Sequence, residues 1–184
     1  MSLKMQGRCW VFGDNLGTHA EILPVPISVL LTRDSHDPKV LKDYLMTGVD
    51  PDFPRKVQKG DFIVAGKNFG HGNPHLWGYL TMKELGIGLI AESMARGGYR
   101  LAAVAGVSFL TPVAGITGKV KTGDRLEVDF ETGEIKDLTS GQAFQAEPLP
   151  GHLLDIIRAG GQDGYLRRKL APTLKHVTPV PLKD

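Results

Sequence analysis

The residues best suited to chemistry lie in a glycine-rich segment, residues 66–76, which reads GKNFGHGNPHL. It follows an apolar run, residues 62–65, whose composition is typical of a buried strand. Asn73 is a favourable helix N-cap, and Pro74 suits the first helical position. A helix start presents unpaired N–H groups and partial positive charge, which stabilise a bound carboxylate or phosphate. The sequence therefore predicts a strand, an anion-binding turn and a helix, in that order.

Two histidines of this segment, His71 and His75, could handle protons or contact an anionic substrate. The ordinary pKa of an imidazole lies near neutral pH, which suits a general base. His75 is the candidate catalytic residue, and its alternative is a solvated side chain in the first helical turn. His71 could contact substrate or simply fill the loop. Gly70, Gly72 and Asn73 are candidate substrate-binding residues because they border the predicted helix start.

His19 is a further candidate substrate-binding residue, and with His71 and His75 it could instead bind a metal ion. Two histidines four residues apart form a metal site when both lie on one helix, whereas His71 precedes the predicted cap. We therefore predict no metal ligands in this chain. A stand-alone metal enzyme that uses these histidines is kept as an alternative hypothesis.

Three arginines, Arg33, Arg96 and Arg100, could reach an anionic substrate. Arg96 and Arg100 lie four residues apart, so they share one face of a predicted helix. Solvation or pairing with acidic neighbours is the simpler interpretation for each side chain. Of the three, Arg33 is retained as a candidate substrate-binding residue.

Composition limits the class of protein. The chain has 184 residues, a net charge of +2 and 41% hydrophobic residues, which is typical of one globular domain, residues 1–184. The near-balanced charge indicates no nucleic-acid partner, and the apolar runs are too short to span a bilayer. Cys9 is the single cysteine, which favours a cytoplasmic protein. One thiolate cannot hold an iron–sulfur cluster, so any such cluster must belong to a partner chain.

Periodicity and turn residues predict an α/β order followed by a β meander. The apolar runs predict strands over residues 10–12, 62–65 and 87–91, and over 27–31 a strand with a loop as the alternative. Helical spacing predicts helices over 38–46, 74–85, 93–105, 150–159 and 164–170. Residues 124–148 predict the meander, with Leu126, Val128 and Phe130 on one face. Strands that alternate with helices indicate a parallel part of the sheet. The proline-containing residues 172–184 predict an extended surface tail.

Several stretches are similar to a known family. VAGKNFGHG followed by GIGLIAESMARGGYR, the early FGDNLGTHAEILP and the later GDRLEVDFETGEIKDLTSG resemble the small-subunit family of 3-isopropylmalate dehydratase, also called isopropylmalate isomerase. The likeness covers nearly the whole chain in the right order. It implies an aconitase-type swivel fold: a three-layer β/β/α domain with a mixed sheet.

The resemblance also implies a function. Members pair with a large subunit whose three cysteines hold a four-iron, four-sulfur cluster, and together they dehydrate and hydrate a small 2-hydroxy dicarboxylic acid in leucine biosynthesis. The small subunit caps the cleft with its glycine-rich loop and is not expected to be active alone. The isolated chain could form a homo-oligomer. The substrate implied is 3-isopropylmalate or a related substituted malate.

The chain differs from the family in that loop, which usually reads Gly-Cys-Gly-Ser-Ser-Arg-Glu. The second Ser is the family's base, and Pro74 stands in its place. His75 replaces the carboxylate-binding Arg, Leu76 replaces the Glu, and His71 replaces the Cys. His75 is therefore the predicted proton-handling group. A non-catalytic binding module that keeps the swivel fold is the alternative.

Overall fold

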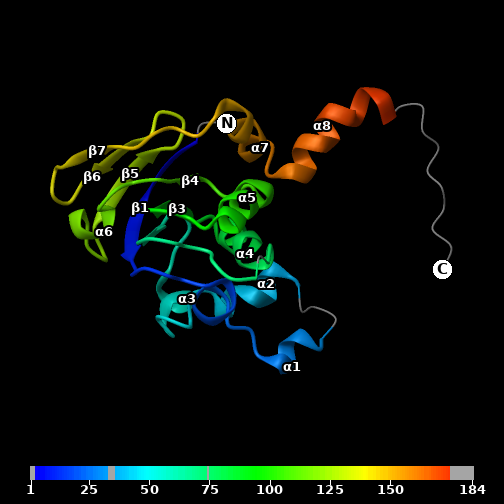
Figure 1. The fold of residues 1–184 in the computed structure, drawn as a ribbon, viewed down its shortest axis with the longest axis horizontal. Coiled ribbons are helices and arrows are strands. Elements are labelled where there is room, and N and C mark those ends of the chain that lie inside the picture. Colours follow the sequence, from blue (N-terminus) through cyan, green and yellow to red (C-terminus); the bar gives the residue numbers. More distant parts are fainter. Residues whose placement is uncertain (1–2, 33–35, 74, 175–184) are drawn as a thin grey trace.

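The computed structural model describes residues 3–32, 36–73 and 75–174, which build one seven-stranded sheet in the order β4-β3-β2-β1-β5-β6-β7 (Figure 1). The strands are β1 (Lys4–Val11), β2 (Phe62–Ala65), β3 (Gly88–Ala91), β4 (Phe109–Leu110), β5 (Arg125–Asp129), β6 (Glu134–Asp137) and β7 (Ala143–Gln145). Strands β1 to β4 pair in parallel, and β5 to β7 continue from β1 in antiparallel order. The predicted mixed sheet is thus confirmed.

Strand β1 joins the two halves of the sheet. Its end pairs with β2 in parallel, with Cys9 opposite Phe62, whereas its start pairs with β5 in antiparallel register, with Lys4 opposite Asp129. All four residues of β2 and all four of β3 are buried, as expected for parallel strands that are covered on both faces. In β5 only Leu126 and Val128 are buried, which confirms the predicted alternation of the meander.

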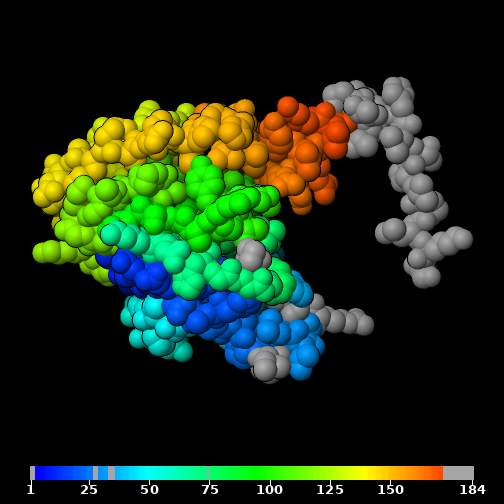
Figure 2. Space-filling view, in the orientation of Figure 1, coloured from blue at the N-terminus to red at the C-terminus, as the bar shows by residue number. Residues whose placement is uncertain are grey.

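Helices connect and cover the strands. The longer ones are α4 (Trp77–Leu85), α5 (Arg96–Ala105), α7 (Gly151–Arg158) and α8 (Gln162–Leu174). The short ones are the π-helix η1 (Thr18–Ile22), α1 (Ile27–Leu30), α2 (Pro38–Leu41), the 3-10 helix η2 (Lys42–Tyr44), α3 (Phe53–Lys56) and α6 (Ile116–Lys119). Helices α4, α5 and α7 lie together beside the sheet, while α8 extends away from it as a protrusion (Figures 1 and 2).

One prediction for the first third of the chain is wrong, and another is confirmed only at its start. Residues 27–31 are not a strand: α1 forms there, and the amides of Val29 and Leu30 both donate to the Pro26 carbonyl. The helix predicted over 38–46 ends at Leu41 and continues only as η2. Met46 has a left-handed φ of 59°, a conformation that an α-helix cannot contain.

The two helices predicted around the glycine-rich segment begin later than expected. Helix α4 starts at Trp77 with Leu76 as its cap residue, so Asn73 is not the cap. Pro74 lies outside the described residues. Helix α5 starts at Arg96 rather than at residue 93, because the backbone before it is hydrogen-bonded to the glycine-rich loop. The Phe69 amide donates to the Ser93 carbonyl, and the Ala95 amide donates to the Phe69 carbonyl.

The C-terminal part is more helical than predicted. The helix predicted over 150–159 is confirmed as α7, and the helix predicted over 164–170 extends in α8 from Gln162 to Leu174. Residues 172–174, the start of the predicted tail, are therefore helical, and the rest of that tail lies outside the described residues. No helix in the described part of the chain is long and apolar enough to cross a membrane.

Candidate active site

The glycine-rich loop lies at the carboxyl ends of β1 and β2, where parallel sheets commonly bind ligands. The segment after β1 runs parallel to this loop and is joined to it by backbone hydrogen bonds, as in a single β-bridge. The Gly70 amide donates to the Leu16 carbonyl at 2.8 Å, and the Thr18 amide donates to the His71 carbonyl at 3.1 Å. The Thr18 hydroxyl donates to the Asn73 carbonyl at 2.6 Å. These bonds fix the path of the loop before any ligand arrives.

The loop turns the carbonyl groups of His71 and Asn73 toward Thr18, and beyond Gly70 it leaves its amides free. Gly70 and Gly72 have positive φ angles of 74° and 87°, which permit this reversal. Within the described residues, the backbone amides of His71, Gly72 and Asn73 donate no hydrogen bond. Successive free amides in a turn of this kind form a concave site that favours a bound anion.

A pocket of about 150 Å³ lies beside this loop, at the N-terminus of α4. Its wall is mainly apolar, with two imidazoles and one threonine, and consists of Thr18, His19, Ile22, Leu23, Val25, Leu30, His75, Trp77, Gly78 and Tyr79. The first amides of a helix have no intrahelical partner and carry partial positive charge. The pocket therefore combines an apolar surface with groups that attract a carboxylate.

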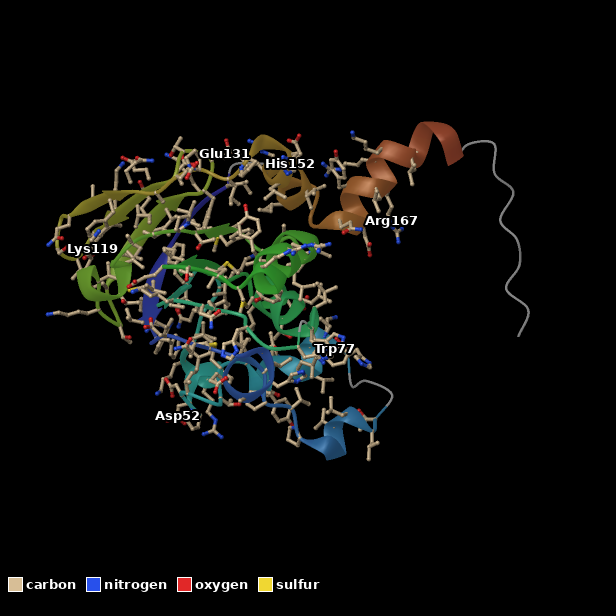
Figure 3. The ribbon with its side chains drawn as sticks, viewed as in Figure 1. Asp52, Trp77, Lys119, Glu131, His152 and Arg167 are labelled. Atoms are coloured by element: carbon tan, nitrogen blue, oxygen red, sulfur yellow. The ribbon has the colours of Figure 1, made fainter. Side chains whose placement is uncertain are left out.

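His19 and His75 come from distant parts of the chain and meet at this pocket. Their ring centroids are 4.4 Å apart, with the ring planes at 74°. His75 also stacks on the indole of Trp77, with the ring centroids 4.8 Å apart. Trp77 is the first residue of α4 (labelled in Figure 3), and α4 lies against α2. Desolvation, followed by the neighbouring His19 ring, lowers the pKa of His75 from its ordinary value of 6.5. His75 is therefore neutral near pH 7 and able to accept a proton.

His71 occupies the loop itself with a fixed ring orientation. Its Nε2 lies 2.9 Å from the carbonyl oxygen of Asn15. A carbonyl oxygen only accepts, so in this bond Nε2 carries the proton and Nδ1 of the neutral ring keeps its lone pair. The Glu21 carboxylate lies near the same ring and accepts a 2.8 Å hydrogen bond from the Gly17 amide. His71 can thus offer an acceptor beside the free amides.

The structure brings together most of the residues that the sequence singled out. Gly70, His71, Gly72 and Asn73 form the loop, and His19 and His75 line the adjoining pocket. Arg33 lies outside the described residues. Arg96 and Arg100, which are exposed on α5, are not part of the pocket wall. The chemical roles of these side chains remain predictions.

Sequence reasoning missed Thr18 and Tyr79. Thr18 carries no motif that marks it, since its role depends on a carbonyl far away in the sequence. The Tyr79 hydroxyl lies where a Cβ of Gly70 or Gly98 would be, so the three residues fit only because two of them are glycines. Gly98 has a low helix propensity, which on its own marks only a weak point of α5. Only the fold shows that the missing side chain of Gly98 makes room for the Tyr79 hydroxyl.

This chain's own residues do not fit an iron–sulfur cluster. Cys9 is buried, its thiol donates to the Lys121 carbonyl, and burial raises its pKa to about 12. A cluster takes several thiolates, and one protonated thiol cannot supply them. Among the described residues, no group of three or more His, Cys, Asp or Glu side chains could hold a metal ion.

A mixed seven-stranded sheet covered by helices, with a glycine loop at the carboxyl ends of its parallel strands, defines an α/β protein of the three-layer β/β/α swivelling class. No protein-family model matches the chain. The chain is 46% identical over 168 residues to an isopropylmalate/citramalate isomerase small subunit of Methanocaldococcus jannaschii, covering 91% of this chain and 96% of that protein.

Two further comparisons agree. A 3-isopropylmalate dehydratase small subunit of Aquifex aeolicus is 37% identical over 172 residues, which cover 93% of this chain and 99% of that protein. The crystal structure of a 3-isopropylmalate dehydratase from Methanocaldococcus jannaschii matches with a TM-score of 0.81 and 36% identity, over 94% of this chain and 99% of that one. The chain belongs to the 3-isopropylmalate dehydratase small-subunit family, which confirms the resemblance noted in the sequence.

Proposed function

We propose that this protein is the small subunit of a hydro-lyase that dehydrates and hydrates a small 2-hydroxy dicarboxylic acid. The observation that carries the proposal is the row of free amides at His71, Gly72 and Asn73, next to a pocket that His19 and His75 border. The names of its relatives support the same function. Those relatives are enzyme subunits, so the non-catalytic binding module has nothing in its favour.

Different residues of the site bind the substrate and transfer the proton, according to their chemistry. The amides of His71, Gly72 and Asn73 in the loop 70–73 hold one carboxylate of the substrate, and His75 takes up the proton next to a carboxylate. His19 and Arg33 contact the second carboxylate of the substrate. The apolar part of the pocket, with Leu23, Val25 and Leu30 among its residues, accommodates an alkyl substituent. This combination suits 3-isopropylmalate or a related substituted malate.

A second chain completes the enzyme. The name "small subunit" of the relatives supports a large-subunit partner, and the family resemblance supports a four-iron, four-sulfur cluster in that partner. When bound, the cluster would supply a Lewis acid for the substrate hydroxyl. The present chain would orient the substrate, exclude water and hold the proton. A cytoplasmic location and a role in leucine biosynthesis follow from the same proposal.

Reconstitution tests the proposal directly. The chain is combined with the three-cysteine large subunit from the same genome, the cluster is assembled without oxygen, and ultraviolet absorbance follows the unsaturated acid. The substrates are 3-isopropylmalate, citramalate and unsubstituted malate. We expect turnover of a substituted malate by the pair and none by the small subunit alone. A fully loaded complex that turns over none of them would refute the proposed activity.

A further inference from the structure

Two asparagines that follow β1 and β2 adopt a backbone conformation that residues other than glycine seldom adopt. Asn15 and Asn68 have left-handed φ angles of 56° and 59°. Their side chains meet although 53 residues separate them, and Asn68 Nδ2 donates to Asn15 Oδ1 at 3.0 Å. Both residues are exposed, so their contact adds little to the hydrophobic core. An unusual backbone conformation at such a place points to a role in the neighbouring site.

Backbone contacts hold both asparagines in place. The Asn15 amide donates to the Lys67 carbonyl at 2.8 Å, and the Asn68 amide donates to Ser93 Oγ at 2.9 Å. The segments that follow β1, β2 and β3 are thereby joined next to the glycine-rich loop. The bond between the two side chains adds a further link and restrains the direction of the Asn15 carbonyl.

The Asn15 carbonyl in turn holds the ring of His71. Its oxygen lies 2.9 Å from Nε2. The same edge of the ring lies against Gly17, where a Cβ would come within 3.2 Å of His71 Cε1 and 3.3 Å of Nε2. Because a carbonyl oxygen only accepts, Nε2 carries the proton in this bond, and Nδ1 of the neutral ring is an acceptor. Within the described residues, Nδ1 has no hydrogen-bond partner.

We propose that Asn15 and Asn68 are positioning residues, whose side-chain contact holds the Asn15 carbonyl against Nε2 of His71 so that Nδ1 accepts a hydrogen bond from the hydroxyl of the substrate. His71 is the residue that touches the substrate, and the two asparagines act through it. The proposal rests on the proposed function and assigns the hydroxyl of that substrate a binding group in this chain.

An acceptor beside the free amides selects the kind of ligand. The amides of His71, Gly72 and Asn73 donate and suit a carboxylate, whereas the lone pair of Nδ1 needs a donor. A 2-hydroxy acid carries such a donor on the carbon next to its carboxylate. The hydroxyl uses its hydrogen in this bond, so the lone pairs of its oxygen stay available.

NMR of the full chain with 15N-labelled histidine tests the positioning role without requiring turnover. Asn68→Gly removes the side-chain contact, and glycine adopts the left-handed conformation at no steric cost. Asn15→Gly removes the same contact from the other side and keeps the Asn15 carbonyl. Gln145→Ala is the matched control, because it removes an amide side chain that donates to the Thr132 carbonyl at the far edge of the sheet.

The ring nitrogens of His71 are recorded at about pH 8.5, where imidazole rings are neutral, and are assigned from their loss in His71→Gln. A ring held in one tautomer keeps its two 15N shifts far apart. We expect these shifts to move toward each other in both glycine variants, as the second tautomer appears, and to stay unchanged in the control. Unchanged ring shifts in the folded glycine variants would overturn the positioning role, since a purely structural contact alters stability alone.

Steady-state kinetics of the assembled complex test the role of Nδ1. The amide nitrogen of glutamine can replace Nε2 as the donor to Asn15, but glutamine has no acceptor in place of Nδ1. His71→Gln should therefore raise KM about threefold to tenfold while kcat changes little.

A double-mutant cycle then links the asparagines to His71. Asn68→Gly should raise KM about threefold in the parent chain and leave it unchanged in the His71→Gln chain. The same rise in both chains would show that Asn68 does not act through His71. The two proposals fail separately: a complex inactive on every tested acid refutes the proposed function, whereas unchanged His71 ring shifts refute the positioning role even in an active complex.

Discussion

The hydroxyl of Thr18 donates a 2.6 Å hydrogen bond to the carbonyl oxygen of Asn73, and so ties η1 to the end of the glycine loop. Thr18 is buried, and its own amide holds the His71 carbonyl. Side-chain and main-chain bonds from one residue thus engage the carbonyls of both His71 and Asn73. The amides between them are left free to meet a ligand.

Thr18→Val should therefore loosen the loop. The substitution keeps the shape but leaves the Asn73 carbonyl without its donor, which costs about 1–2 kcal/mol in the free energy of unfolding. Chemical denaturation measures this loss, and KM of the complex should rise with it. Thr47→Val is the matched control, since Thr47 also donates to a carbonyl, that of Tyr44, away from the loop. Equal KM values in both variants would mean that Thr18 does not preorganise the site.

Replacement of His75 tests the base. His75→Ala should lower kcat of the complex by about a hundredfold, the usual contribution of a positioned general base. His152→Ala, on the exposed surface of α7, should leave kcat unchanged. Turnover that survives in His75→Ala at the level of the control would discard the assignment.

The pH dependence of kcat/KM should follow the titration of His75. Desolvation, followed by His19, lowers the pKa of His75, and the neutral ring is the active form. The value of kcat/KM should rise with pH as His75 loses its proton, with a midpoint below 6.5, and fall on acidification. A pH series on the complex records the profile. A midpoint above the ordinary imidazole value would contradict a desolvated base.

The buried hydroxyl of Tyr79 makes no hydrogen bond within the described residues, and burial raises its pKa. An unsatisfied buried hydroxyl destabilises the folded state. Tyr79→Phe should therefore raise the free energy of unfolding by about 1 kcal/mol, measured by urea titration. A loss of stability would indicate that this hydroxyl has a bonding partner after all.

A double-mutant cycle tests the packing around that hydroxyl. A Cβ at position 98 would lie 2.6 Å from the Tyr79 oxygen and 3.1 Å from the Gly70 Cα. Gly98→Ala should cost about 1–3 kcal/mol through this overlap. Because Tyr79→Phe removes the nearest atom, the double variant should recover part of the loss. Strict additivity of the two changes would place the strain elsewhere.

The order of elements in this chain is largely readable from local sequence. The runs at 62–65 and 87–91 form buried strands, and β-type alternation at Leu126 and Val128 continues into a meander. These segments are predictable because their hydrophobic pattern agrees with their final environment. Local preference failed at residues 27–31, where an apolar, β-branched run forms α1 and joins no strand of the described sheet.

The amino-acid sequence alone determined the family, the mixed sheet, and the presence of a glycine-rich turn with histidines near it. Only the tertiary structure decided how that turn works. Asn73 and Pro74 have strong helix-start preferences, yet the Asn73 carbonyl is taken by Thr18 and α4 begins at Trp77. The contact between the rings of His19 and His75 likewise exists only because the fold brings two distant segments together. Hydrogen bonds and ring contacts between distant segments outweigh local preferences of about 1 kcal/mol per residue, and no local pattern in the sequence records them.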